Sequence, residues 1–135
     1  MTYLLDTTAF SDLMREHPVF DKRLASLTEN DLIMICPVVR GEILFGLGKL
    51  EAGRRRQDLE TKANKFFAVL HCESISEMTA DHYAKVKIAR QNKGLTLDEN
   101  DLWIAACALA SQVTLVSRDG DFRQIDGLTV EDWTK

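Results

Sequence analysis

The fold is decided by two adjacent stretches, LDENDLWIAACALA (residues 97–110) and VTLVSRDGDF (residues 113–122). An acidic cluster leads directly into an apolar segment, which predicts a helix packed on much of its circumference. A short β-rich run follows and ends in a second acidic cluster. A helix that begins at carboxylates and a strand that ends at carboxylates can bring both groups to one edge of a sheet. This arrangement indicates metal-dependent chemistry.

Short apolar runs alternate with helical patterns along the whole chain. The expected strands, the last of them at an edge, are residues 3–5, 32–36, 69–72, 114–117 and 128–130. This alternation predicts an α/β fold, in which a mainly parallel sheet of four to five strands is sandwiched by helices. The length of 135 residues predicts one domain with one core, spanning residues 1–135.

Helix boundaries follow from capping residues. Thr7 or Thr8 is expected to cap the first helix, and Asn100 is expected to cap a later helix that has Asp101 in its first turn. Residues 76–79 have the form of a capping box, with threonine in place of the usual acid. A helix is predicted from about 38 to 50. Asp98, which lies just before the helix that Asn100 is expected to cap, is interpreted as a bystander that takes no part in the metal-dependent chemistry.

Composition excludes several classes of protein. No apolar run approaches the roughly 20 residues needed to span a bilayer, and the N-terminus lacks the basic region of a signal peptide. Three widely spaced cysteines form no zinc or disulfide pattern, so they are interpreted as core residues in a reducing cytoplasm. The net charge of −4 argues against broad, unassisted nucleic-acid binding. It is compatible with a nuclease whose acids are neutralised by divalent cations.

Four acids stand at strand ends or at the start of a facing helix: Asp6, Glu42, Asp101 and Asp119. In an open parallel sheet, sites form outside the carboxyl ends of the strands, so these acids are expected at one edge. Asp121 is a further candidate. Taken singly, each acid has a simpler explanation as a helix cap, a first-turn charge or a turn residue. Those explanations do not account for the joint placement.

Four carboxylates in one cleft repel each other, and hard divalent cations remove that conflict. Mg²⁺ and Mn²⁺ prefer oxygen ligands and can share coordination with a phosphate. No His, Cys, Ser or Lys is placed to supply a nucleophile. The pattern therefore predicts hydrolysis of a phosphodiester by water that the metal activates.

The same segments resemble the PIN-domain ribonucleases, and especially the VapC-type toxins of prokaryotic toxin–antitoxin pairs. The matching motifs are residues 4–7, 38–46, 100–106, 114–122 and 128–133. By this resemblance, Asp6, Glu42, Asp101 and Asp119 hold Mg²⁺ or Mn²⁺ in an endoribonuclease that acts on RNA. The resemblance also implies a homodimer and a hetero-oligomer with a cognate antitoxin.

Two departures from the family pattern concern this site. Thr8 replaces the usual Asn, which leaves the water or substrate contact of that side chain without its usual donor. The turn from Asp119 to Asp121 is one residue shorter than the common form, which leaves open how these two acids share the work.

Several further residues are candidate RNA contacts. They are Thr7, Ser117, Arg54, Arg55, Arg56, Arg90 and Lys93. For the basic residues, the alternative is a solvated helix face. Two rival functions are also open: a receiver-like signalling or binding module, and a catalytically silent PIN scaffold. A receiver domain usually has two acids directly after its first strand, whereas Asp6 stands alone here. Glu42 would also have no role in a receiver domain.

Overall fold

The computed structural model describes residues 1–135 and is built around a parallel sheet. Its five strands have the order β3-β2-β1-β4-β5, and every neighbouring pair is parallel. The strands are β1 (Thr2–Leu5), β2 (Leu32–Ile35), β3 (His71–Cys72), β4 (Thr114–Val116) and β5 (Val130–Glu131). The predicted α/β fold is confirmed.

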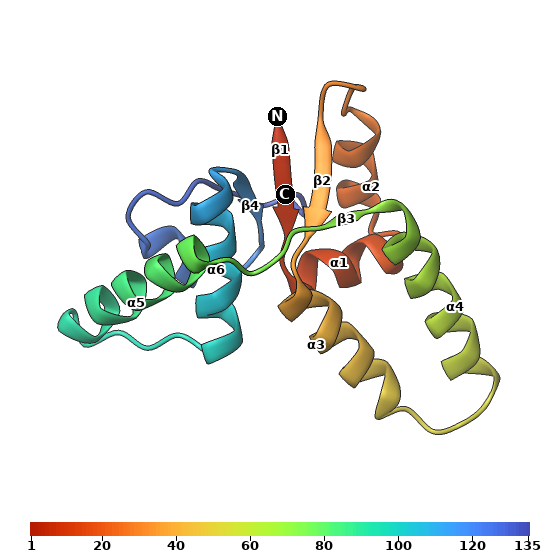
Figure 1. Ribbon diagram of the computed structural model, residues 1–135. Helices are drawn as coiled ribbons and strands as arrows, with labels where there is room; N and C mark the ends of the chain where they lie inside the picture. The colour runs from red at the N-terminus through yellow and green to blue at the C-terminus, as the bar shows by residue number, and fades with distance from the viewer.

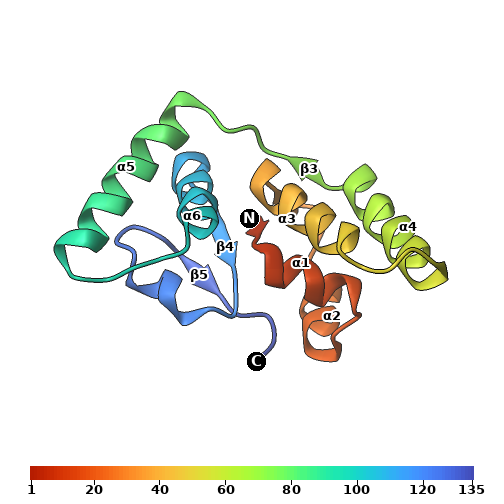
Figure 2. The ribbon, with the colours of Figure 1, turned by 90° about the horizontal axis from the view of Figure 1, so that it is seen from below.

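Helices cover the sheet from both sides. They are α1 (Thr7–Met14), α2 (Pro18–Ala25), α3 (Pro37–Gly48), α4 (Arg54–Val69), α5 (Glu77–Asn92), α6 (Glu99–Ser111) and the 3₁₀ helix η1 (Gly120–Gln124). Figures 1 and 2 show α5 and α6 on one side of the sheet and α1, α2 and α4 on the other. Helix α3 and the start of α6 lie beyond the carboxyl ends of the strands (Figure 1). None of the helices has both the length and the apolar composition needed to cross a membrane.

The core lies where the central strands meet the helices. Leu4 of β1 pairs in register with Met34 of β2 and Leu115 of β4, and all three side chains are buried. Helix α6 packs closely because its small residues Ala105, Ala106 and Ala108 are fully buried, as its composition predicts. The predicted burial of the cysteines holds for Cys36 and Cys107 but is wrong for Cys72, which the short edge strand β3 leaves partly exposed.

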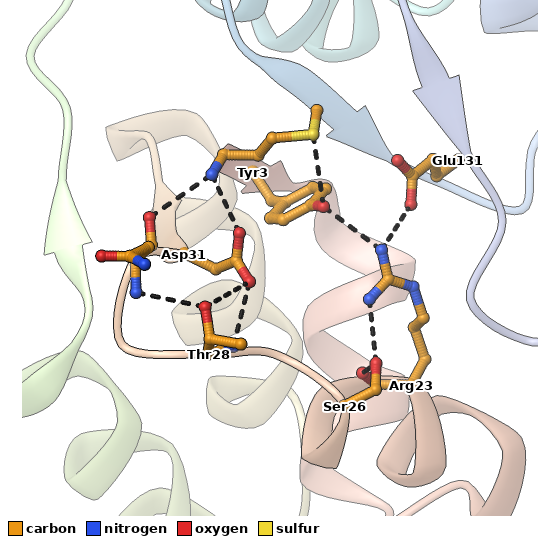
Figure 3. Close-up of polar contacts among 8 residues, drawn as sticks. Tyr3, Arg23, Ser26, Thr28, Asp31 and Glu131 are labelled. Carbon is orange, nitrogen blue, oxygen red and sulfur yellow. Dashed lines mark hydrogen bonds and ion pairs between the residues drawn. The ribbon is translucent and has the colours of Figure 1, made fainter.

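A network of charged and polar side chains fastens α2 to the sheet (Figure 3). The guanidinium of Arg23 donates to the Tyr3 hydroxyl and to Glu131 Oε1, both at 3.2 Å. The amino group of Met1 lies 2.9 Å from Asp31 Oδ1, and the Thr28 N–H donates to Asp31 Oδ2 at 3.0 Å. We call Met1, Tyr3, Arg23, Ser26, Thr28, Asn30, Asp31 and Glu131 the paired network.

Two predicted helix starts are wrong by one or two residues. Asp6 caps α1, since its Oδ1 accepts from the Ala9 N–H at 2.7 Å, and Thr7 already lies inside the helix. Asp98 caps α6 by accepting from the Asn100 N–H at 3.1 Å, which places Asn100 in the first turn. In both cases an aspartate one or two residues upstream takes the capping role. The capping box that begins at Ser76 is confirmed.

Candidate metal centre

The four predicted acids reach one edge of the sheet from four segments. Asp6 follows β1 and is only 3% exposed, and its N–H donates to the carbonyl of Val116 at the end of β4. Glu42 lies in the first half of α3 and Asp101 in the first turn of α6, while Asp119 follows β4 and caps η1. The last three are half-buried.

The charges of these acids act on one another. Burial, followed by the charges of Asp98, Glu42, Asp6 and Asp119, raises the pKa of Asp101 to about 7. Burial also raises the pKa of Asp6, with a smaller contribution from Asp119, although hydrogen bonds oppose the rise. Asp121 is exposed and is not among the charges that raise either pKa. Asp98, interpreted from the sequence as a bystander of this site, caps α6, and its charge contributes to the raised pKa of Asp101.

None of the four acids has a cationic partner. The ion pairs of the molecule involve other carboxylates. One of these is Asp12, whose burial in α1 the sequence did not predict. Its carboxylate pairs with Arg15 at 2.7 Å and with Arg118 at 3.5 Å. Arg118 directly precedes Asp119, so this pair ties the Asp119 turn to α1. Basic side chains near the edge therefore neutralise Asp12 and leave the four acids unpaired.

Hydroxyl groups orient the acids. Thr7 donates to Glu42 Oε1 at 2.5 Å and so joins α1 to α3. Thr8 donates to the carboxylate of Asp6 at 3.0 Å. Ser117 accepts from the Asp119 N–H at 3.0 Å and shapes that turn. The predicted substrate contacts Thr7 and Ser117 thus touch the acids or their turn, a role that no spacing in the sequence indicated.

The donor set fits a hard divalent cation. It consists of carboxylate oxygens without a cationic partner, and burial together with neighbouring acids raises the pKa values of Asp6 and Asp101. Such groups are stabilised by Mg²⁺ or Mn²⁺, which take oxygen ligands. No three His, Cys, Asp or Glu side chains lie close enough to form a ready-made cation site. Metal binding by these residues therefore stays a prediction.

Two hollows adjoin Glu42. A groove of about 380 Å³ lies between α1, α3 and α4 and has a mainly apolar lining beyond Thr7, Arg15 and Glu42. A second hollow, of about 440 Å³, lies between α3 and the start of α6, where Glu42 and Asn100 face the same space beside Phe45. A larger ligand can therefore reach the acidic edge from two sides of α3.

The predicted basic contacts occupy different environments. Arg54 and Arg55 are exposed at the start of α4, and Lys93 is exposed beyond α5. Arg56 pairs with Glu60 at 2.9 Å. Arg90 is only 5% exposed, and its guanidinium donates to backbone carbonyls. The prediction that Arg90 contacts RNA is wrong, since its guanidinium is buried and bonds to the protein backbone.

Comparisons with known proteins agree with this fold. The chain is 29% identical over 137 residues to Ribonuclease VapC2 of Rickettsia felis, and both chains are covered completely. It is 29% identical over 141 residues to Ribonuclease VapC1 of Haemophilus influenzae, again over 100% of each chain.

Two solved structures are similar over nearly the whole chain. A crystal structure of VapBC2 from Rickettsia felis bound to a promoter DNA fragment matches with a TM-score of 0.88 and 28% identity, covering 98% of this chain and 99% of the other. A structure of VapBC-1 from nontypeable Haemophilus influenzae matches with a TM-score of 0.88 and 26% identity over 100% of each chain.

The family model of the PIN domain matches residues 3–128, a span that contains all four acids and the sheet except for Thr2 and the edge strand β5. With the parallel sheet and the acids at its carboxyl edge, this match establishes that the chain belongs to the PIN-domain family.

Proposed function

We propose that this protein is a divalent-metal-dependent endoribonuclease and the toxin of a toxin–antitoxin pair. The observation that carries the proposal is the set of four carboxylates at one sheet edge, which act on one another and have no cationic partner. Relatives named as VapC ribonucleases, similar over their full length, support the same activity.

The acids divide the work of holding the metal. Asp6 and Asp101 are the principal ligands, and Glu42 and Asp119 complete the oxygen donor set. When bound, Mg²⁺ or Mn²⁺ lowers the pKa of a water molecule and offsets charge on the phosphate. Thr7 keeps Glu42 turned toward α1, and Thr8 holds the Asp6 carboxylate. Water is the nucleophile: its oxygen forms a new bond to phosphorus, one P–O bond to a ribose oxygen breaks, and a proton from the water ends on that leaving oxygen.

RNA is proposed to approach through the hollow between α3 and α6, because Glu42 and Asn100 both border it. Arg54, Arg55 and Lys93 remain proposed phosphate contacts. If two of these charges bind phosphate, replacing Arg54 and Arg55 with Gln should flatten the salt dependence of RNA binding by roughly 1.4 in logarithmic slope. An unchanged slope would assign both residues to the solvated face of α4.

The apolar groove between α1, α3 and α4 is the proposed site for an antitoxin segment. Its lining includes Met14, Ile43, Leu47 and Leu59, and Glu42 stands at its border. A segment seated there therefore lies beside the acidic edge. Solved structures of VapBC complexes with a similar fold support a partner of this kind. A homodimer also stays a proposal.

The rival functions account for fewer of the observations. A receiver-like module has no role for Glu42, whereas here the charge of Glu42 acts on Asp101. The PIN-domain match also rules out the receiver fold. A silent scaffold has no need for four unpaired carboxylates at one sheet edge, among which neighbouring acids help to raise the pKa values of Asp6 and Asp101.

The deciding experiment compares RNA cleavage by the wild type with that of Asp6→Ala, Asp101→Ala and the control Asp81→Ala, which replaces an exposed acid on α5. We expect cleavage only with Mg²⁺ or Mn²⁺, and its loss in the first two variants but not in the control. Circular dichroism checks that each variant is folded. Cleavage at the wild-type rate by folded Asp6→Ala and Asp101→Ala would refute the proposal. Growth arrest that is relieved by a small protein encoded next to the gene tests the toxin role.

A further inference from the structure

Arg90 is a buried cation without a carboxylate partner. It is 5% exposed and takes part in none of the ion pairs of the molecule. Its Nε is buried and has no hydrogen-bond partner. Burying a guanidinium without an anionic partner costs free energy, which its hydrogen bonds offset only in part. An alkyl side chain of similar size would fill the space at lower cost.

The remaining contacts of Arg90 go to the two acidic segments of the site. Nη2 donates to the Thr96 carbonyl at 2.9 Å, in the loop that leads to the α6 cap and then to Asp101. Nη1 donates to the Asp121 carbonyl at 3.4 Å, in the turn that follows Asp119. These two segments are far apart in the sequence, and one side chain of α5 connects them.

Backbone N–H groups make further hydrogen bonds within both segments. The Leu95 N–H donates to the Arg90 carbonyl at 2.9 Å, so the loop before α6 is bound to Arg90 through both its backbone and its side chain. On the other side, the Asp121 N–H donates to Asp119 Oδ1 at 2.9 Å. A hydrogen-bonded path thus runs from the guanidinium through Asp121 to the carboxylate of Asp119.

We propose that Arg90 is a positioning residue, which sets the separation between the Asp101 and Asp119 segments so that both carboxylates can hold one divalent cation. It touches neither the metal nor the RNA. Arginine suits this role because its planar fork presents several donors in fixed directions, whereas the ammonium of lysine cannot bridge two such carbonyls as rigidly. The metal-holding role of the two acids is taken from the proposed function.

Mn²⁺ binding without RNA, measured by electron paramagnetic resonance on the full chain, tests this role. The variants are Arg90→Met, which removes the donors, and Arg90→Lys, which keeps the charge. Lys85→Met is the matched control, because Lys85 is exposed on the same helix. We expect Mn²⁺ binding about 10-fold weaker in Arg90→Met, a smaller loss in Arg90→Lys, and no change in the control. Saturating Mn²⁺ should restore much of the kcat for RNA cleavage.

A double-mutant cycle separates positioning from a general loss of stability. In the Asp119→Asn background the path from Arg90 has no carboxylate to position, so Arg90→Met should weaken Mn²⁺ binding much less than in the wild type. Wild-type Mn²⁺ affinity in folded Arg90→Met would overturn the proposal, and so would equal losses in both backgrounds. If Arg90→Met does not fold, the same cycle is run with Arg90→Lys and judged by the same two outcomes. Failure of the wild type to cut RNA, with Mn²⁺ binding and the coupling intact, refutes only the nuclease proposal.

Discussion

Carboxylates in two regions of this molecule have opposite surroundings. In the paired network of Figure 3, Asp31 faces the amino group of Met1 and Glu131 faces Arg23. At the carboxyl edge, Asp101 takes part in no ion pair, and the charges of Asp98, Glu42, Asp6 and Asp119 act on it. Hydrogen bonding to the amino group and to the Thr28 N–H lowers the pKa of Asp31, whereas burial and neighbouring carboxylates raise that of Asp101 to about 7.

This difference is the one expected between acids that stabilise a fold and acids that bind a ligand. An ionised carboxylate next to a cation or a donor favours the folded state, while one held among like charges opposes it. A chain that keeps the second arrangement loses stability unless something binds there. Perturbed carboxylates in such a group are typical of functional sites. The predictions below test this division, beginning with the largest expected effect.

Asp119 and Asp121 are the sharpest test within the acidic edge. Asp119 is half-buried and its charge contributes to the raised pKa values of Asp6 and Asp101, whereas Asp121 is exposed. Asp119→Asn should therefore lower kcat/KM for RNA about 100-fold, and Asp121→Asn by less than about 5-fold. Both rates are measured at saturating Mg²⁺. The reverse order would make Asp121 the ligand and Asp119 the turn residue.

Much of this site is predictable because strand ends and acids can be read directly from the sequence. Two apolar runs predict strands, and Asp6 and Asp119, which follow them, mark the carboxyl edge of the sheet. The alternation of strands and helices then brings these acids together with Glu42 and Asp101. The role of Arg90 was not predictable, since its neighbours Lys87 and Lys93 are of the same charge and only tertiary packing buries it. Likewise, Asn100 and Asp98 are both good capping residues, and the backbone path before α6 decides between them.

A substitution of Asp101 should also measure how much folding stability is lost by keeping this carboxylate among other acids without a cationic partner. Asp101→Asn removes a desolvated, repelled charge, so at pH 7.5 in EDTA it should raise the free energy of unfolding by roughly 1–2 kcal/mol, which allows for screening of a half-exposed group. Mg²⁺ should raise the Tm of the wild type much more than that of the variant, since only the wild type keeps the full donor set. Thermal unfolding with and without Mg²⁺ measures both effects. A variant less stable than the wild type in EDTA would contradict this account.

Arg23 makes the complementary test in the paired network. Its guanidinium bonds Tyr3 and Glu131 and lies 5.1 Å from the Trp133 ring centroid. Arg23→Met should therefore lower the free energy of unfolding by about 1 kcal/mol, a modest figure because the ion pair is partly exposed. Mn²⁺ affinity should not change, since no acid of the metal centre belongs to this network. A weakened affinity would show that the two regions are not independent.

The smallest effects should distinguish the regions by the sign of their response to acid. The folded-state pKa of Asp101, about 7, lies above its ordinary value of 3.8, so the stability of the wild type falls as the pH rises from about 4 to 7, and the full cost is present above pH 7. The stability advantage of Asp101→Asn in EDTA should therefore shrink as the pH falls from 7.5 toward 4. Asp31 has a lowered pKa, so the advantage of the wild type over Asp31→Asn should persist to about pH 4 and disappear only below it. Denaturant unfolding of the three proteins across this range measures both differences. If both differences change over the same pH range, the two carboxylates do not have the opposite environments that separate the acidic edge from the paired network.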